Sequence, residues 1–138
     1  MRVSMHDIVE AVAQVSGDMP DDLRGPCRAA ALVRARQVAY WLGRDHGHSL
    51  TRIGRALGGR DHTTVLQGLR RVALLARDDA DLADLIDAAR GAVLARTIAR
   101  RAGVGDVEAL RGAVLARLQA APVPVLARVA GLLAVSHG

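Results

Sequence analysis

Apolar side chains recur every three or four residues along most of this chain, the spacing that places them on one face of an α-helix. The first such segment starts at Ser4 and ends before Gly17, with its apolar face made of Ile8, Val9, Val12 and Val15. One helical turn is predicted at residues 20–23, where a proline precedes two aspartates, and Gly25 and Pro26 then interrupt the pattern. The longest helix of this half is predicted over residues 30–45, with Trp41 in the core.

Two further helices are joined by a tight glycine turn. Ser49 is a candidate N-cap for a helix through Leu57, and Gly58-Gly59 ends that helix. The next helix is predicted over residues 61–77 and should bury Val65, Leu66, Leu69 and Val72, with Leu75 as a further candidate. This is a helix-turn-helix arrangement, in which the first residues of the second helix reach the DNA major groove.

The rest of the chain continues the helical pattern. One helix is predicted from Asp81 to about Ala102, another begins at Asp106, and Pro122-Val123-Pro124 separates it from a third. These helices either fold back and enlarge the core or form an apolar surface for self-association or for a partner protein, with membrane-surface binding a weaker alternative. We therefore predict an all-α chain with a helix-turn-helix domain at residues 1–90 and a helical extension at residues 91–138.

Composition agrees with helical packing and narrows the class of protein. The 138 residues include no Phe, one Tyr and one Trp, and the hydrophobic 51% is mostly Ala, Val and Leu. A second large catalytic domain does not fit this length. Without a signal-like N-terminus or an apolar run of about twenty residues, and with Cys27 as the only cysteine, we expect a cytoplasmic, nucleoid-associated protein that does not enter a membrane.

Positive charge is concentrated in the middle of the chain. All 19 cationic side chains are arginines, and eleven of them fall in residues 24–77 against only Asp45 and Asp61, a net charge of +9. The segments on either side carry −4 and 0. A solvated cationic helix face ordinarily interleaves acids with its basic residues, so this segment favours contact with a polyanion.

The start of the second helix of the predicted helix-turn-helix carries side chains suited to base edges. Asp61 can accept from a cytosine amino group, His62 can pack on a thymine methyl or hydrogen-bond a base, and Thr63 and Thr64 offer a methyl and a hydroxyl each. The same residues also suit an ordinary helix start, with Asp61 as cap. Position alone leaves these two interpretations equal.

The stretch Gly58-Gly59-Arg60-Asp61-His62-Thr63-Thr64-Val65-Leu66, together with residues 34–39 and 49–57, resembles the C-terminal, origin-box-binding domain (domain IV) of the bacterial replication initiator DnaA. The resemblance covers about residues 6–90 and implies recognition of double-stranded DNA at DnaA-box-like sites. By this resemblance, Asp61, His62, Thr63 and Thr64 read bases in the major groove and Arg28 enters the adjacent minor groove. The implied DNA backbone contacts are Arg34, Arg36, Gln37, Arg44, Leu50, Thr51, Arg60, Gln67 and Arg70.

Two departures from the family pattern bear on function. Gly25, Pro26 and Cys27 stand where the family often has basic residues, and the turn near Gly47 is about one residue shorter, so we expect weaker, more salt-sensitive or less selective binding than a full initiator shows. The chain also has no lysine, which excludes a Gly-x-x-x-x-Gly-Lys phosphate loop. We therefore expect a free-standing DNA-binding domain without the initiator's ATPase domain.

No catalytic constellation accompanies these motifs. His46 and His48 form the one close histidine pair, and we interpret them as a solvated turn because acidic or cysteine partners at ligand spacing are missing. We expect no enzyme activity, metal or cofactor. Two functions stay open: modulation of replication initiation or transcription through box-like DNA sites, or an adaptor that acts on the initiator or another protein through residues 106–135 with weak non-specific DNA binding. A homodimer is compatible with either.

Overall fold

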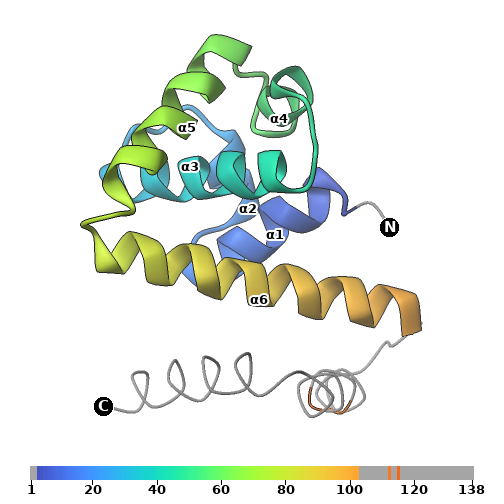
Figure 1. Cartoon of the computed structure of the whole chain (residues 1–138). Coiled ribbons are helices and arrows are strands. Elements are labelled where there is room, and N and C mark those ends of the chain that lie inside the picture. The colour runs from blue at the N-terminus through green and yellow to red at the C-terminus, as the bar shows by residue number, and fades with distance from the viewer. Residues whose placement is uncertain (1–2, 103–111, 113–114, 116–138) are drawn as a thin grey trace. The chain divides into compact units, whose positions relative to one another are not determined.

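Helices alone make up the secondary structure of the part of the chain that the structure, a computed structural model, describes: residues 3–102, 112 and 115 (Figure 1). In chain order they are α1 (Met5–Ser16), α2 (Pro20–Arg24), α3 (Ala30–Asp45), α4 (Leu50–Ala56), α5 (His62–Leu75) and α6 (Ala80–Ala102). The all-α class predicted from periodicity is confirmed, and the predicted bounds of the third helix agree with those of α3.

The chain divides into two compact units, Met1–Thr97 and Ile98–Gly138. The domain boundary predicted at residue 90 falls inside the continuous helix α6. The helices predicted from Asp106 and after Pro124 lie outside the described residues, as does nearly all of the segment proposed for an adaptor. That alternative and the homodimer therefore stay predictions.

Short polar residues begin α1 and α4 as the sequence predicts. The Ser4 hydroxyl accepts the Asp7 backbone N–H at 3.1 Å, and the Ser49 hydroxyl accepts the Arg52 N–H at 3.1 Å. Each bond satisfies one of the backbone donors that a helix start leaves without an intrahelical partner. Local chemistry thus decides where these two helices begin.

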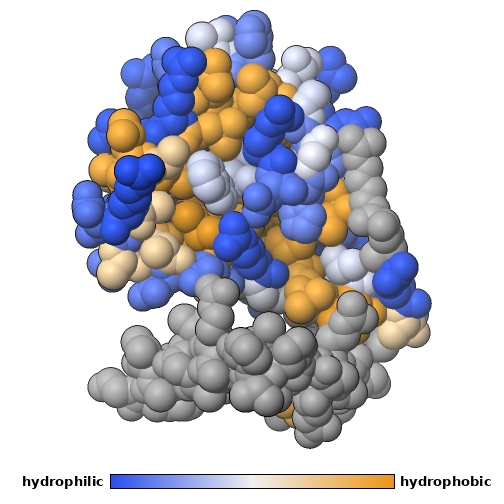
Figure 2. Space-filling view, in the orientation of Figure 1, coloured by the Kyte–Doolittle hydropathy of each residue, from blue (hydrophilic) through white to orange (hydrophobic). Residues whose placement is uncertain are grey.

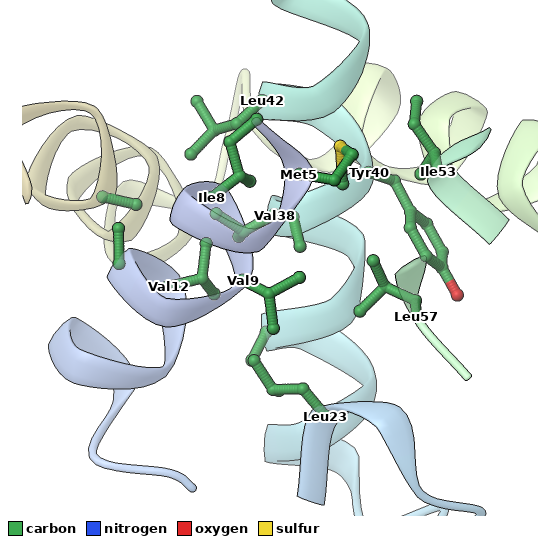
Figure 3. Close-up of a cluster of buried hydrophobic side chains, with 14 of the residues drawn as sticks. Met5, Ile8, Val9, Val12, Leu23, Val38, Tyr40, Leu42, Ile53 and Leu57 are labelled. Carbon is green, nitrogen blue, oxygen red and sulfur yellow. The ribbon is translucent and has the colours of Figure 1, made fainter. Parts of the chain in front are cut away.

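The core lies mainly between α1 and α3, with α2, α4, α5 and α6 closing it. Figure 3 shows Ile8, Val9 and Val12 of α1 facing Val38 and Leu42 of α3. Leu23 of α2 and Leu57, which follows α4, are also fully buried and extend the same cluster. From α5 the core takes Val65 and Val72, and from α6 it takes Leu82, Ile86, Ala89 and Val93.

Some side chains expected inside the core lie at its edge. Trp41 is only partly buried and packs against the cluster, and so does Leu69. Leu66 is half-buried and Leu75 is 37% exposed. In Trp41's place, Tyr40 is the buried aromatic, at 3% exposure.

Helices α3 and α5 approach closely at a glycine. A Cβ atom on Gly68 would lie 2.6 Å from Cδ2 of the Tyr40 ring, far inside normal contact. The missing side chain allows the Tyr40 ring to pack on the α5 backbone. This contact fixes α5 against the core while its first turn projects outward.

Candidate nucleic-acid interface

The turn between α4 and α5 is built on glycines. Gly58 and Gly59 have φ angles of 90° and 80°, in the left-handed region that favours glycine. The N–H groups of Gly59 and Arg60 both donate to the Gly54 carbonyl oxygen, at 3.0 and 2.8 Å. This bonding ends α4 and turns the chain sharply into α5, which confirms the predicted helix, turn and helix.

The four residues expected to read bases lie together at the start of α5, and all four are exposed. Asp61 occupies the N-cap position and its carboxylate accepts the Thr63 hydroxyl at 3.1 Å. His62 Nδ1 lies 2.9 Å from the other carboxylate oxygen. The pKa of Asp61 is lowered mainly by the hydrogen bond from the Thr63 hydroxyl. The Asp61 carboxylate is therefore an ionised acceptor at neutral pH.

Beside these residues runs an open groove of about 960 Å³ between the α2–α3 loop, α3 and α5. Residues expected at the DNA line it from these three elements and from the α4–α5 turn, namely Arg28, Arg36, Gln37, Arg60, Thr64, Gln67 and Arg70. The tertiary structure thus brings the expected minor-groove arginine to the same surface as the start of α5.

Two arginines of the groove were not predicted. Arg71 is exposed and shares a helix face with Thr64 and Gln67, so the helical spacing of α5 could have identified it. Arg24 ends α2 and reaches the groove only through the packing of that helix. Its position could not be read from the sequence.

Arg36, one of the expected backbone contacts, is held within the domain. Its side chain is 4% exposed, and its guanidinium donates to the carbonyl oxygens of Leu23, Asp22 and Gly25 at 2.8, 3.0 and 2.8 Å. Burial, followed by the nearby charge of Arg60, lowers the pKa of Arg36. The structure assigns this arginine to the interior, where it holds the chain at the end of α2.

Arg60, Arg34 and Arg44 also have partners within the chain. Arg60 is half-buried and its Nη2 donates to the Gly25 carbonyl at 2.7 Å. Arg34 pairs with Asp79 at 2.7 Å, and Arg44 donates to the His48 carbonyl at 3.1 Å. Of the remaining expected backbone contacts, Thr51 is exposed and Leu50 is partly buried in the first turn of α4.

Most positive charge in residues 24–77 is not compensated by ion pairs. Among the described residues, the only arginines of this segment in ion pairs are Arg24, with the exposed Asp21, and Arg34, with Asp79. Figure 2 shows strongly hydrophilic side chains standing out among apolar surface on the face it presents. Uncompensated cations over a groove are the electrostatic condition for binding a polyanion.

The histidine pair differs from expectation. His46 is exposed, whereas His48 is 2% exposed and its Nε2 lies 2.6 Å from the Val3 carbonyl oxygen. His48 therefore fastens the N-terminal segment to the α3–α4 turn. No group of three or more His, Cys, Asp or Glu residues suited to a metal occurs in the described part of the chain, and no helix there is long and apolar enough to span a membrane.

Comparisons with known proteins point to one family. The protein-family model described as "Bacterial dnaA protein helix-turn-helix" matches residues 5–72 of the chain. The chain is 43% identical over 82 residues to the chromosomal replication initiator protein DnaA of Caulobacter vibrioides, covering 59% of this chain and 17% of that protein. It is 39% identical over 84 residues to the protein of the same name from Cereibacter sphaeroides, covering 60% and 18%. The chain thus spans less than a fifth of the length of these relatives.

Exposed polar residues at the start of the second helix, beside an arginine-lined groove, define a DNA-binding helix-turn-helix domain. Residues 5–72 belong to the helix-turn-helix family of bacterial DnaA proteins, and the domain is of the DnaA C-terminal type. The resemblance stated from the sequence is therefore confirmed.

Proposed function

We propose that the protein binds double-stranded DNA at specific sequences resembling the DnaA box. The observation that carries this proposal is the exposure of Asp61, His62, Thr63 and Thr64 side by side at the start of α5. These side chains combine acceptors, donors and methyl groups at the position where a helix-turn-helix enters the major groove. The similarity to proteins named as replication initiators supports the same target.

Each residue has a distinct role in this proposal. The ionised Asp61 accepts from a cytosine amino group, and its bond with Thr63 holds both side chains in one arrangement. His62 packs on a thymine methyl or hydrogen-bonds a base, and Thr64 faces the groove. The exposed Arg28 enters the adjacent minor groove, where arginine is favoured in narrow segments.

Polar and basic groups around the groove supply the sequence-independent part of binding. Gln67, Arg70 and Arg71 lie along α5 beyond Thr64, and Arg24 lies across the groove. Arginine matches phosphate with two parallel hydrogen bonds, so these side chains suit the DNA backbone. They position the duplex while the first turn of α5 selects its sequence.

The biological consequence of such binding is occupancy of initiator sites. A protein bound at box-like sequences competes with or assists a full initiator, or regulates transcription nearby. Because the chain has no lysine, it does not supply an initiator's nucleotide-driven step through a lysine-containing phosphate loop. We propose a binding role and no catalytic one.

Fluorescence anisotropy of the full chain on a box duplex and on a scrambled duplex tests the proposal. The measurement is made at about 50 and 200 mM salt, a range over which binding through phosphate contacts weakens strongly. The wild-type protein should prefer the box, and the double variant His62→Ala, Thr63→Ala should lose that preference. Gln14→Ala, an exposed change on α1, is the matched control and should retain it. Equal, salt-abolished binding of wild-type protein to both duplexes would contradict the proposal.

A further inference from the structure

Arg60 connects the helix-turn-helix to the loop that carries Arg28. Its Nη2 donates to the Gly25 carbonyl oxygen at 2.7 Å, and its Nη1 donates to the Leu57 carbonyl and, at 3.5 Å, to the Arg24 carbonyl. One guanidinium therefore bonds the end of α4 and the end of α2 together. These two segments lie more than thirty residues apart in the sequence.

A second arginine holds the same point from another direction. Arg36 on α3 donates to the Gly25 carbonyl at 2.8 Å as well as to Leu23 and Asp22. A carbonyl oxygen has two lone pairs, so Gly25 can accept from both arginines. The loop at residues 25–29 thus starts at a carbonyl held by two guanidinium groups and ends at α3, the helix that carries Arg36.

The backbone of the glycine turn packs directly on this point. A Cβ atom on Gly58 would lie 1.9 Å from the Arg24 carbonyl oxygen, so only glycine allows the observed approach. Beyond the held segment, residues 26–29 are exposed, and Arg28 is among them. The loop is therefore anchored at its base and open to solvent at the residue expected to meet DNA.

We infer that Arg60, with Arg36, is a positioning residue that fixes the minor-groove loop relative to the first turn of α5. This inference rests on the proposed function, because it concerns how Arg28 and the base-reading residues meet one duplex together. A loop held in its bound position loses less conformational entropy on binding than a free loop. The anchoring therefore lowers the entropy cost of DNA binding for a loop that carries a single basic side chain, Arg28.

The contacts require arginine and not merely a positive charge. Arg60 bonds three carbonyl oxygens and Arg36 bonds three, geometries that suit the planar, multi-donor guanidinium. Within the described chain neither residue takes part in an ion pair. Burial and the charge of Arg60 lower the pKa of Arg36, as expected for two cations held together by carbonyls.

A double-mutant cycle on DNA distinguishes positioning from direct phosphate contact. Arg60→Lys is measured by anisotropy on the box duplex, alone and combined with Arg28→Ala. If Arg60 acts through Arg28, the lysine variant should weaken box binding about tenfold in the wild-type background and less than about twofold without Arg28. Arg70→Ala is the control and should give a similar loss in both backgrounds.

An effect of Arg60→Lys that is the same with and without Arg28 would overturn the inference. Wild-type affinity of the Arg60→Lys variant for the box duplex would also overturn the inference, because lysine keeps the positive charge but lacks the planar, multi-donor guanidinium. Circular dichroism of each variant checks that the protein is folded. Because Arg60 is only half-buried, Arg60→Lys is less disruptive than a change at the buried Arg36.

A measurement without DNA tests the anchoring separately. Cys27 is the only cysteine of the chain, is exposed and lies in the loop beside Arg28, so a nitroxide label on its thiol reports loop mobility by electron paramagnetic resonance. Arg60→Lys and Arg60→Met should make the loop more mobile and so narrow the lines of the spectrum. Arg70→Ala should leave the spectrum unchanged. An unchanged spectrum in both Arg60 variants would overturn the inference. Because no duplex is present, this result stands apart from any failure of box-selective binding.

Discussion

The Oδ2 atom of Asp79 lies 2.7 Å from Nη2 of Arg34, and Oδ1 of the same carboxylate accepts the Leu82 N–H at 3.0 Å. One carboxylate therefore caps the start of α6 and binds it to α3. The Leu82 N–H first, and then the Arg34 charge, lower the pKa of Asp79 below its usual value of 3.8. Arg34, expected at the DNA backbone, thus has a partner inside the domain.

Replacing Asp79 should destabilise the first unit. Asp79→Ala removes both the helix cap and the Arg34 partner, so we expect a melting temperature a few degrees lower at pH 7 by circular dichroism. A carboxyl with a lowered folded pKa contributes stability above its unfolded pKa and loses it as pH falls through the folded value. The difference between wild type and variant should therefore shrink below about pH 4. The control Asp78→Ala changes an exposed neighbour and should melt at the same temperature as wild type. If Asp79→Ala also melted at the wild-type temperature, the role of Asp79 as helix cap and Arg34 partner would be contradicted.

The Thr63 hydroxyl should control the ionisation of Asp61. Thr63→Val keeps the shape of the side chain and removes the donor, so the pKa of Asp61 should rise toward its usual 3.8. Titration of the side-chain carboxyl carbon by NMR measures this directly. Thr64→Val removes a neighbouring hydroxyl and should leave the pKa of Asp61 in place. A matching pKa in wild type and Thr63→Val would show that the bond does not form in solution.

The two glycines of the turn should respond differently to the same substitution. Both have positive φ, so alanine carries a strain of about 1 to 2 kcal/mol at either position. Gly59 has open space around it, whereas a Cβ on Gly58 meets the Arg24 carbonyl oxygen. We expect Gly58→Ala to lower the free energy of unfolding by at least about 2 kcal/mol more than Gly59→Ala, as measured by urea denaturation. Equal losses would argue against the close contact.

Arg71 should contribute to affinity without contributing to selectivity. Arg71→Ala should weaken binding to box and scrambled duplexes by the same factor and reduce the slope of log affinity against log salt by about 1. Arg77→Ala removes an equal charge from an exposed position that does not line the groove. That variant should change the slope less. Loss confined to the box duplex would instead assign Arg71 to base reading.

Much of the fold could be predicted because its signals are local. The spacing of apolar residues predicted α3 at residues 30–45, and Ser4 and Ser49 marked helix starts through bonds to residues three positions away. Gly58 and Gly59 marked the turn because few other residues adopt its backbone. The residues proposed to read bases also lie in one contiguous stretch, which is why the resemblance could point to them.

The fate of individual polar side chains was harder to predict. An arginine suits a phosphate and a carbonyl oxygen equally, and its sequence position does not show which lies nearby. Arg36, expected at the DNA backbone, is buried among carbonyls of residues 22–25, which its sequence position does not show. His48 was assigned to a solvated turn and instead bonds Val3, 45 residues away.

The sequence by itself determined the helices, the glycine turn, the charge of the central segment and the family of the helix-turn-helix, because each depends on neighbouring residues or on composition. Only the tertiary structure decided which arginines face solvent and which hold the loop to the turn. That division depends on contacts between α2, α3 and the α4–α5 turn. Such contacts form only when the apolar faces of the helices pack, so they cannot be predicted from a local pattern in the sequence.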